Sequence, residues 1–228
     1  MEHLSILSGN QLKLVAMLTM LTDHIGMILF PRLPVFRIIG RLAMPLFAYM
    51  IAEGCRYTRR RSRYFLSVAG LGVLCQLAFS ISAGSLYQNI LLTFSLSIAT
   101  VFAVDRVIAD RSTASVASAV LVIGCVLFLT LCLPSLLDGF AVDYGLFGVL
   151  LPVAVYYAPD KLSRVAACGL VLTGLALVSK PVQWFALLAL PLLLLYNGKR
   201  GKRQMKYLFY LFYPLHLLLL QGVKLLLS

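Results

Sequence analysis

Apolar runs of membrane-spanning length recur along the whole chain, separated by short polar stretches. A transmembrane helix needs about 20 predominantly apolar residues. The composition agrees, because 61% of the residues are hydrophobic and only 12% are charged, against about 25% charged in an average soluble domain. The apolar segments are residues 12–30, 36–54, 64–83, 89–107, 114–133, 144–159, 162–178, 182–197 and 207–227. The sequence therefore predicts an all-α fold, a polytopic integral membrane bundle of about nine transmembrane helices, as one domain over residues 1–228.

Lysine and arginine gather in alternate connections between these segments. Cytoplasmic loops of membrane proteins carry an excess of both residues, so the asymmetry predicts orientation. The basic connections are 55–63, 106–111, 161–164 and 199–206, whereas the other side has Arg32, Lys180 and Lys224, with Arg37 at its edge. This predicts a cytoplasmic N-terminus. The short, dispersed clusters also argue that the net charge of +12 serves contact with membrane lipids and not with nucleic acid.

Ionisable side chains inside the first two apolar segments are the strongest indication of function. These side chains are Asp23, His24, Arg37, Arg41 and Glu53. A charged side chain at a bilayer centre costs roughly 2.5–3.5 kcal/mol on insertion scales, which simple anchoring would not require. On the predicted topology the first four lie in the outer half of the membrane, and Glu53 lies at the inner end.

Asp23 and His24 are neighbours in sequence, but on a helix their side chains point about 100° apart. They therefore cannot form a hydrogen-bonded dyad with each other, and we expect each to find a partner across a helix interface. Arg37 and Arg41 are four residues apart and share a helix face. An ion pair between Asp23 and one of these arginines is the natural arrangement, and its plainest role is to lock two helices together.

Two histidines lie inside apolar segments, His24 in the first and His216 in the last. Histidine suits proton transfer near neutral pH, so both are candidates for a general base. The plainer interpretation is that each is a polar packing residue. Metal binding by both histidines and Asp23 is a weaker alternative, and we predict no metal site.

A run of arginines follows the second apolar segment: Arg56, Arg59, Arg60, Arg61 and Arg63. It serves as an orientation signal and suits contact with anionic lipids. Guanidinium groups also bind phosphate through paired hydrogen bonds. The run is therefore a candidate docking site for a phosphorylated cytosolic cofactor.

Asn89 and Asp143 stand at the outer starts of the fourth and sixth apolar segments. Side-chain oxygens of Asn and Asp accept hydrogen bonds from the backbone N–H groups of a first helical turn. The plain expectation is that both residues are helix N-caps.

Several stretches, in order over nearly the whole chain, look like one known family. They are LKLVAMLTMLTDHIGMILFP, FRIIGRLAMPLFAYMIAEGCRYTRRRSRY, NILLTFSL, DYGLFGVLLP, and QWFALLALPLLLLYNGKRGKR leading into KYLFYLFYPLHLLLL. Together they resemble the TraX family, the conjugative F-pilin acetylases and their relatives. The most specific pieces are DHIG, GRLAMPLFAY and FYPLH, because polar groups inside apolar spans seldom recur by chance. Met44 departs mildly from the family's commoner GRLAFPLFA.

The resemblance implies a multi-pass enzyme of the bacterial inner membrane. It would acetylate the N-terminus of a pilin subunit during conjugative pilus biogenesis, with acetyl-CoA as the donor. His24 would serve as general base, or else His216. Arg37 or Arg41 would stabilise developing charge or hold Asp23. The CoA phosphates would be attracted from inside by Arg56 and the run Arg59, Arg60 and Arg61, with Arg37 and Glu53 as further cofactor-binding residues.

Two alternatives stand beside this interpretation. The first keeps acyl transfer but takes a sugar or a lipid-linked glycan as acceptor. The second is a non-enzymatic accessory or proton-coupled transport protein of pilus assembly, with the buried charges as a relay. A transporter would usually show inverted repeats, and no convincing repeat is visible. The charges crowd into the first quarter of the chain, which favours the enzyme.

Overall fold

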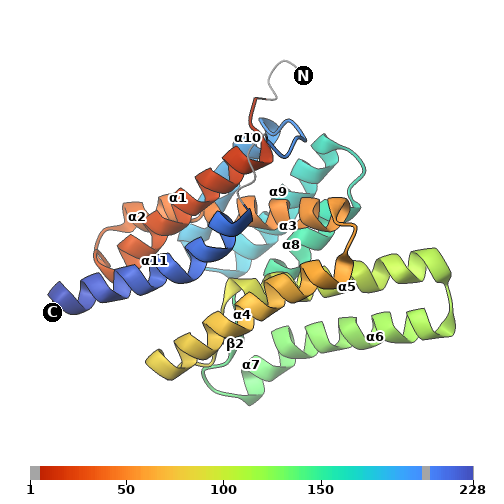
Figure 1. The fold of residues 1–228 in the computed structure, drawn as a ribbon, viewed down its shortest axis with the longest axis horizontal. Helices are drawn as coiled ribbons and strands as arrows, with labels where there is room; N and C mark the ends of the chain where they lie inside the picture. The colour runs from red at the N-terminus through yellow and green to blue at the C-terminus, as the bar shows by residue number, and fades with distance from the viewer. Residues whose placement is uncertain (1–5, 202–205, 228) are drawn as a thin grey trace. The chain divides into compact units, whose positions relative to one another are not determined.

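The computed structural model describes residues 6–201 and 206–227, arranged in two compact units. The first unit contains residues 1–50 and 159–228, and the second unit contains residues 51–158. Figure 1 shows the course of the chain. The first unit thus brings together segments from the two ends of the sequence, and the second unit is one continuous stretch.

Helices occupy all nine predicted apolar segments in the described residues, so the all-α prediction is confirmed. They are α1 (Gly9–Ile28), α2 (Pro34–Gly40), α3 (Ala43–Tyr57), α4 (Arg61–Ala83), α5 (Ile90–Asp110), α6 (Thr113–Leu127), η2 (Phe128–Cys132), α7 (Leu133–Leu136), α8 (Gly145–Tyr157), α9 (Lys161–Val178), η3 (Pro181–Leu188), α10 (Ala189–Leu194) and α11 (Lys206–Leu227). Two short parallel strands accompany them, β1 (Tyr87–Gln88) and β2 (Ala141–Val142).

Five helical stretches of the described chain are long and apolar enough to cross a membrane. They are Pro34–Tyr57, Arg61–Ile81, Ile90–Asp110, Thr113–Leu136 and Lys161–Val178. Three apolar helices are shorter, namely Gly145–Tyr157, Pro181–Leu194 and Tyr210–Leu226. Nine crossings and a cytoplasmic N-terminus stay predictions. Lys202 and Arg203, part of the basic connection 199–206, lie outside the described residues.

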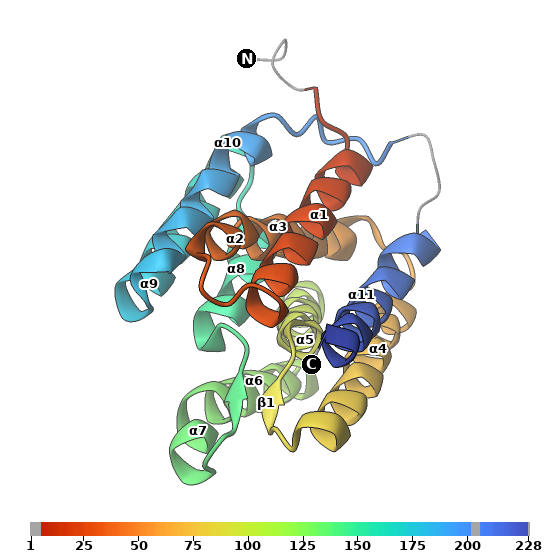
Figure 2. The same cartoon turned by 90° about the vertical axis from the view of Figure 1, so that its left-hand side faces the viewer.

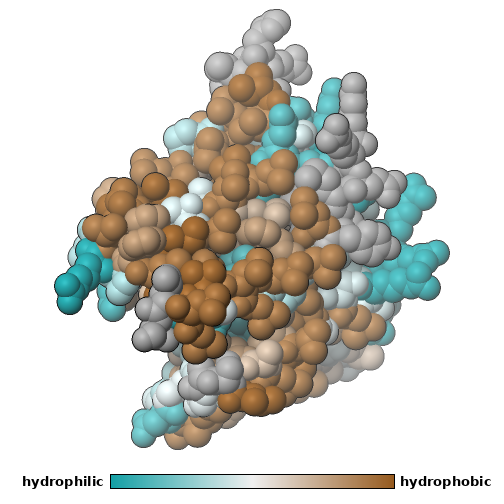
Figure 3. Space-filling view, turned by 60° about the vertical axis from the view of Figure 1, so that its left-hand side comes forward, coloured by the Kyte–Doolittle hydropathy of each residue, from teal (hydrophilic) through white to brown (hydrophobic). Residues whose placement is uncertain are grey.

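Apolar side chains cover most of the face that Figure 3 shows, which is largely brown. Only 11% of the most apolar window of Thr113–Leu136 is buried, although its mean hydropathy is 2.8. Large side chains such as Leu74, Leu121 and Leu170 are more than half exposed. Water would disfavour such surfaces, whereas lipid chains would cover them without cost. The protein is therefore a membrane protein.

In the first unit, α1 packs against α2 and against α11, and α9 packs against η3 and α10 (Figure 2). α1 starts with a capping box, in which the Ser8 side chain accepts from the Gln11 N–H and the Gln11 side chain accepts from the Ser8 N–H. The contact of α1 with α2 is close, because a Cβ on Gly26 would lie 2.2 Å from Cβ of Phe36. This explains the glycine of DHIG.

Three predicted segments are not continuous α-helices, and proline contributes to two of the departures. Pro134 has no N–H for the carbonyl of Thr130, and the helix widens into the π turn η2 just before it. Pro181 opens the 3-10 helix η3, and Pro191 likewise removes a donor from α10. The third departure is a turn at Arg41 between α2 and α3.

In the second unit, α5 packs against α4, α6 and α8. Short hydroxyl side chains of α5 hydrogen-bond to backbone of its neighbours: Ser97 donates to the carbonyl of Val149 at 3.0 Å, and Thr93 donates to the carbonyl of Asp143 at 3.0 Å. Both hydroxyl residues are fully buried. α5 therefore packs against α8 through small polar residues, as in many membrane helix pairs.

The two expected N-caps had different outcomes. Asn89 caps α5, since its side chain accepts from the N–H of Leu91 at 3.0 Å, as predicted. The prediction for Asp143 was wrong. Tyr144 occupies the N-cap of α8 in a left-handed conformation (φ 58°), so the helix starts one residue later and the Asp143 carboxylate instead accepts from the Tyr87 hydroxyl at 2.7 Å.

Candidate functional site

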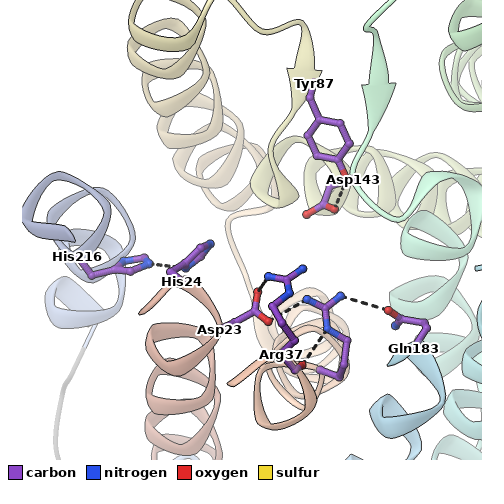
Figure 4. A network of polar contacts seen from close by, with 8 residues as sticks. Asp23, His24, Arg37, Tyr87, Asp143, Gln183 and His216 are labelled. Atoms are coloured by element: carbon purple, nitrogen blue, oxygen red, sulfur yellow. Dashed lines mark hydrogen bonds and ion pairs between the residues drawn. The ribbon is translucent and has the colours of Figure 1, made fainter. Parts of the chain in front are cut away.

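The carboxylate of Asp23 on α1 binds two arginines of the next helical segment. Its Oδ2 accepts from Nη1 of Arg37 at 2.6 Å, and its Oδ1 accepts from Nη2 of Arg41 at 2.9 Å. The side chains of Asp23 and Arg41 are 13% and 10% exposed, whereas that of Arg37 is 35% exposed. The predicted ion pair is thus present, but with both arginines and not with one (Figure 4). Two guanidinium groups on one carboxylate leave a net positive charge at this point of the unit.

Gly40 makes this close approach feasible. A Cβ at Gly40 would lie 2.1 Å from Oδ1 and 2.3 Å from Cβ of Asp23. Any larger residue would displace the aspartate from its two partners. The glycine that precedes Arg41 in GRLAMPLFAY is therefore part of the ion-pair site.

Gln183 on η3 completes the group, and the sequence interpretation missed it. Nη1 of Arg41 donates to Oε1 of Gln183 at 3.3 Å, and Gln183 is 5% exposed (Figure 4). Nε2 of Gln183 is buried and has no hydrogen-bond partner among the described residues. A polar amide inside an apolar segment was the signal that could have identified it. A buried donor without a partner is rare in folded proteins and calls for an explanation.

His24 and His216 form the second pair of the site, between α1 and α11. Nε2 of His216 lies 2.9 Å from Nδ1 of His24, and the ring centroids are 4.9 Å apart (Figure 4). The ring of Phe212 stacks on His216 at 4.7 Å between centroids, and the edge of Tyr213 faces it at 5.9 Å. FYPLH thus supplies both a histidine and the rings that hold it.

The hydrogen bonds of this pair determine which nitrogens carry protons. Nδ1 of His216 lies 2.7 Å from the carbonyl oxygen of Phe212, which can only accept, so this nitrogen carries the hydrogen. In neutral His216, Nε2 is then unprotonated and accepts from Nδ1–H of His24. Neutral His24 therefore has a free lone pair on Nε2, which has no hydrogen-bond partner within the described residues. The arrangement can accept a proton at this atom.

Because Asp23 and His24 are consecutive, they place the two pairs on adjacent faces of α1. Asp23 contacts α2 and the turn at Arg41, while His24 contacts α11. The prediction that they do not bond to each other but each find a partner across an interface agrees with this geometry. In the described part of the chain, no three His, Cys, Asp or Glu side chains are grouped as a metal site.

The arginine run expected to bind a cofactor lies in the second unit, and two of its members have protein partners. Arg37, which was also expected to bind the cofactor, lies in the first unit and pairs with Asp23. Nη2 of Arg56 donates to the carbonyl of Tyr156, and Nε of Arg56 lies 4.0 Å from Oε1 of buried Glu53. Nη2 of Arg61 donates to Oδ2 of Asp105 at 2.6 Å. Arg56 and Arg61 therefore also stabilise the unit.

Arg59 and Arg60 differ from these two, because both are exposed and neither has a hydrogen bond or an ion pair among the described residues. Asp105, which the sequence analysis did not single out, also accepts from the hydroxyls of Tyr156 at 2.7 Å and Tyr157 at 3.1 Å. An acid near the end of an apolar segment was the signal for it. Cofactor binding by the arginine run stays a prediction.

Comparison with known proteins supplies the family. A stretch of 38 residues is 53% identical to an uncharacterised protein of Rickettsia prowazekii (strain Madrid E), and it covers 17% of this chain and 15% of that relative. The match thus spans a small part of both proteins. No solved structure matches the chain. The family model described as TraX protein matches residues 8–224, which is nearly the whole chain, and the chain therefore belongs to the TraX family.

Proposed function

We propose that the protein is a membrane-embedded acetyltransferase of the bacterial inner membrane. It transfers the acetyl group of acetyl-CoA to the N-terminal amine of a pilin subunit during conjugative pilus biogenesis. Membership of the TraX family supports this class of reaction. The observation that carries the proposal is the His24–His216 pair, which leaves Nε2 of His24 without a hydrogen-bond partner among the described residues.

His24 is the general base in this proposal. The amine nitrogen of the acceptor attacks the thioester carbonyl carbon, and Nε2 of His24 removes the proton that the nitrogen must lose. The carbonyl oxygen becomes an oxyanion. When it collapses, the bond from carbon to sulfur breaks and the CoA thiolate takes the proton back from His24. The products are the acetylated amine and free CoA.

His216 is a positioning residue in this scheme. By accepting from Nδ1–H of His24 it fixes the tautomer that exposes Nε2, as a carboxylate or carbonyl does for other catalytic histidines. It also disperses the charge of the imidazolium that forms. The roles of the two histidines are therefore unequal, with His24 at the reacting atoms.

Arg37 and Arg41 supply positive charge for the oxyanion. Asp23 orients both guanidinium groups, and Gln183 gives Arg41 a further acceptor. The side chain of Arg37 is the more exposed of the two, which suits contact with a substrate. Preoriented donors of this kind contribute several kcal/mol to acyl transfer, roughly 3–4 for one donor.

The arginine run attracts the donor. Arg59 and Arg60 are exposed and suit the first electrostatic contact with the anionic donor, while Arg56 lies beside Glu53 and Arg61 pairs with Asp105. On the predicted topology this run faces the cytoplasm, where acyl-CoA is made. The acetyl group then has to reach His24 from inside.

The test is an acetyl-transfer assay with the protein in nanodiscs, acetyl-CoA and a peptide with the N-terminal sequence of a pilin, followed by mass spectrometry of the peptide. His24→Ala should lower kcat by roughly 10²–10⁴-fold, the usual contribution of a general base. Thr22→Ala on the same helix is the matched control and should keep the wild-type rate, because the Thr22 hydroxyl, within the described residues, hydrogen-bonds only to the Leu18 carbonyl of its own helix.

Three results would contradict the proposal. Equal rates for His24→Ala and the wild type would reject the assignment of the base. Acetylation of sugar amines without acetylation of the peptide would reject pilin as the acceptor and favour a glycan. Absence of transfer to either acceptor by the folded wild-type protein would reject the enzyme.

A further inference from the structure

A cavity of about 410 Å³ lies in the first unit. None of its lining residues belongs to the histidine pair or to the Asp23 ion pairs. Three cationic side chains line it, Lys161 and Arg164 from α9 and Lys199 from the connection between α10 and α11. Tyr49, Tyr196 and Asn197 complete most of the lining. Among the described residues that line it there is no carboxylate.

The cations are brought to one place by the fold. Lys161 and Arg164 are three residues apart and share a face of the first turn of α9. Lys199 follows Gly198, whose φ of 72° turns the chain back, and the Lys199 N–H donates to Oδ1 of Asn197 at 2.9 Å. Three positive charges from two distant segments thus surround one cavity.

The loop that carries Lys199 is held by the start of α1. The Gly9 N–H donates to the Lys199 carbonyl at 2.8 Å, and the Asn10 N–H donates to the Arg200 carbonyl at 3.0 Å. The Asn197 N–H donates to the Leu7 carbonyl at 2.9 Å. The site is therefore built before any ligand arrives, which lowers the entropy cost of binding.

Two buried aromatic side chains line the cavity. Tyr49 is fully buried and Tyr196 is 5% exposed, and their rings meet edge to face with 5.9 Å between centroids.

The acid nearest in sequence to the cations of α9, Asp160, caps the N-terminus of that helix. Its Oδ1 accepts from the N–H groups of Leu162 and Ser163, and its Oδ2 accepts from the Ser163 hydroxyl.

We infer that this cavity binds phosphate groups and receives the phosphorylated nucleotide end of the acyl donor. The inference rests on the proposed function. Arginine binds phosphate through paired hydrogen bonds and lysine binds it as a compact charge, and both types are present. The volume lies within the range of small-molecule sites, about 300–1,000 Å³. All three cations belong to connections that the charge distribution predicts to be cytoplasmic.

This assignment gives a binding role to residues that otherwise count only as orientation signals. An anionic lipid headgroup presents the same phosphate chemistry, so the test has to separate the two sources. Acetyl-CoA carries three phosphate groups in its nucleotide part, and S-acetylpantetheine carries none. The difference between these two donors reports phosphate recognition directly.

The experiment measures Kd by isothermal titration calorimetry in nanodiscs of neutral phosphatidylcholine. The variants are Lys161→Gln, Arg164→Gln, Lys199→Gln and the triple variant, and each cation removed should weaken acetyl-CoA binding roughly tenfold. Affinity for S-acetylpantetheine should not change. Lys180→Gln is the matched control, an exposed lysine of the same unit outside the cavity, and should bind acetyl-CoA like the wild type. The doubly exchanged Lys161→Arg, Arg164→Lys variant keeps both charges and should retain most of the affinity.

Several outcomes would overturn the inference. If the wild type binds acetyl-CoA and the triple variant, correctly folded by circular dichroism, binds it equally well, the cavity is not the phosphate site although the proposed function stands. If the wild type does not bind acetyl-CoA at all, the proposed function fails first. If the triple variant loses binding of phosphatidylglycerol in nanodiscs but not of acetyl-CoA, the cavity is a lipid site.

Discussion

His216 and His24 are separated by 192 positions, yet Nε2 of the first lies 2.9 Å from Nδ1 of the second. The contact joins α11 to α1. His24 is the donor and His216 the acceptor, because Nδ1 of His216 donates its hydrogen to the Phe212 carbonyl and leaves Nε2 unprotonated. A hydrogen-bonded pair with a defined order of donor and acceptor results. It ends at Nε2 of His24, the atom to which the proposed function assigns the chemistry.

Replacing His216 tests this order. His216→Phe keeps a ring of similar shape but removes the acceptor for Nδ1–H of His24, so His24 should populate both tautomers. We expect kcat to fall less than in His24→Ala, by roughly 10–100-fold, and a ¹⁵N spectrum of labelled histidine to show a change of the His24 tautomer. An unchanged tautomer together with a lower rate would indicate that His216 acts by packing alone.

Gly40→Ala should break the ion pairs of Asp23 by displacing its carboxylate. The new methyl group would occupy the place of the carboxylate, and overpacking of this kind costs about 1–3 kcal/mol. The measurement is the midpoint of thermal unfolding in detergent. Gly70→Ala is the control, because nothing lies within 4 Å of a Cβ at Gly70 in α4 and alanine favours a helix. A fall of equal size in both variants would contradict the argument.

The two arginines should differ in their contribution to stability. Asp23→Asn leaves both guanidinium groups without their carboxylate and should destabilise most, about 3–5 kcal/mol by analogy with other broken buried pairs. Arg41→Gln should come second, because its side chain is 10% exposed, and Arg37→Gln third, because its side chain is 35% exposed and water can replace it. Chemical denaturation in mixed micelles gives the order, and a larger loss for Arg37→Gln than for Arg41→Gln would refute it.

Gln183→Leu separates stability from activity. The substitution removes an acceptor of Arg41 but also the buried Nε2 group that has no partner, so the two effects on unfolding should nearly cancel, to within about 1 kcal/mol. Under the proposed function the transfer rate should still fall, about tenfold, since Arg41 loses its orientation. Loss of stability without loss of rate would show that Gln183 is a packing residue only.

Asp160 predicts a pH effect at the start of α9. Hydrogen bonds from Ser163 hold the pKa of the Asp160 carboxyl below its usual value of 3.8. Its contribution to stability is therefore complete above that value and is lost as the pH falls through the lowered folded pKa. Asp160→Ala should lower the unfolding temperature at neutral pH, and Asp160→Asn, which retains a capping oxygen, should lower it less. The difference between Asp160→Ala and the wild type should shrink only below pH 3.8, and a difference already lost at pH 5 would contradict the assignment.

The sequence predicted what local pattern and periodicity determine. The apolar segments gave the helices, and the 100° offset of Asp23 and His24 excluded a dyad. The sequence could not predict the partners of these residues, because a pairing such as His24 with His216 depends on which helices pack together. Asp143 was misjudged for a related reason: the N-cap position depends on a left-handed backbone at Tyr144, and tyrosine rarely adopts it.

Two further residues show the same limit. Gln183 and Asp105 are polar groups in apolar segments, so the sequence contained a signal for both. Their significance appears only when Arg41 and Arg61 are seen to contact them. Conversely, the sequence predicted Arg56 and Arg61 only as members of a cofactor-binding run, because nothing local indicates that the Tyr156 carbonyl and Asp105 lie beside them.

The Asp23 ion pairs and the His24–His216 pair should form at different times during synthesis of the chain. The Asp23 contacts need only α1, α2 and the turn that follows, which leave the ribosome early. The His24 contact needs α11, the last helix to be made. A nascent chain can thus pair the charge of Asp23 long before the His24–His216 contact forms. Under the proposed function, catalysis therefore begins only when insertion of the chain has finished.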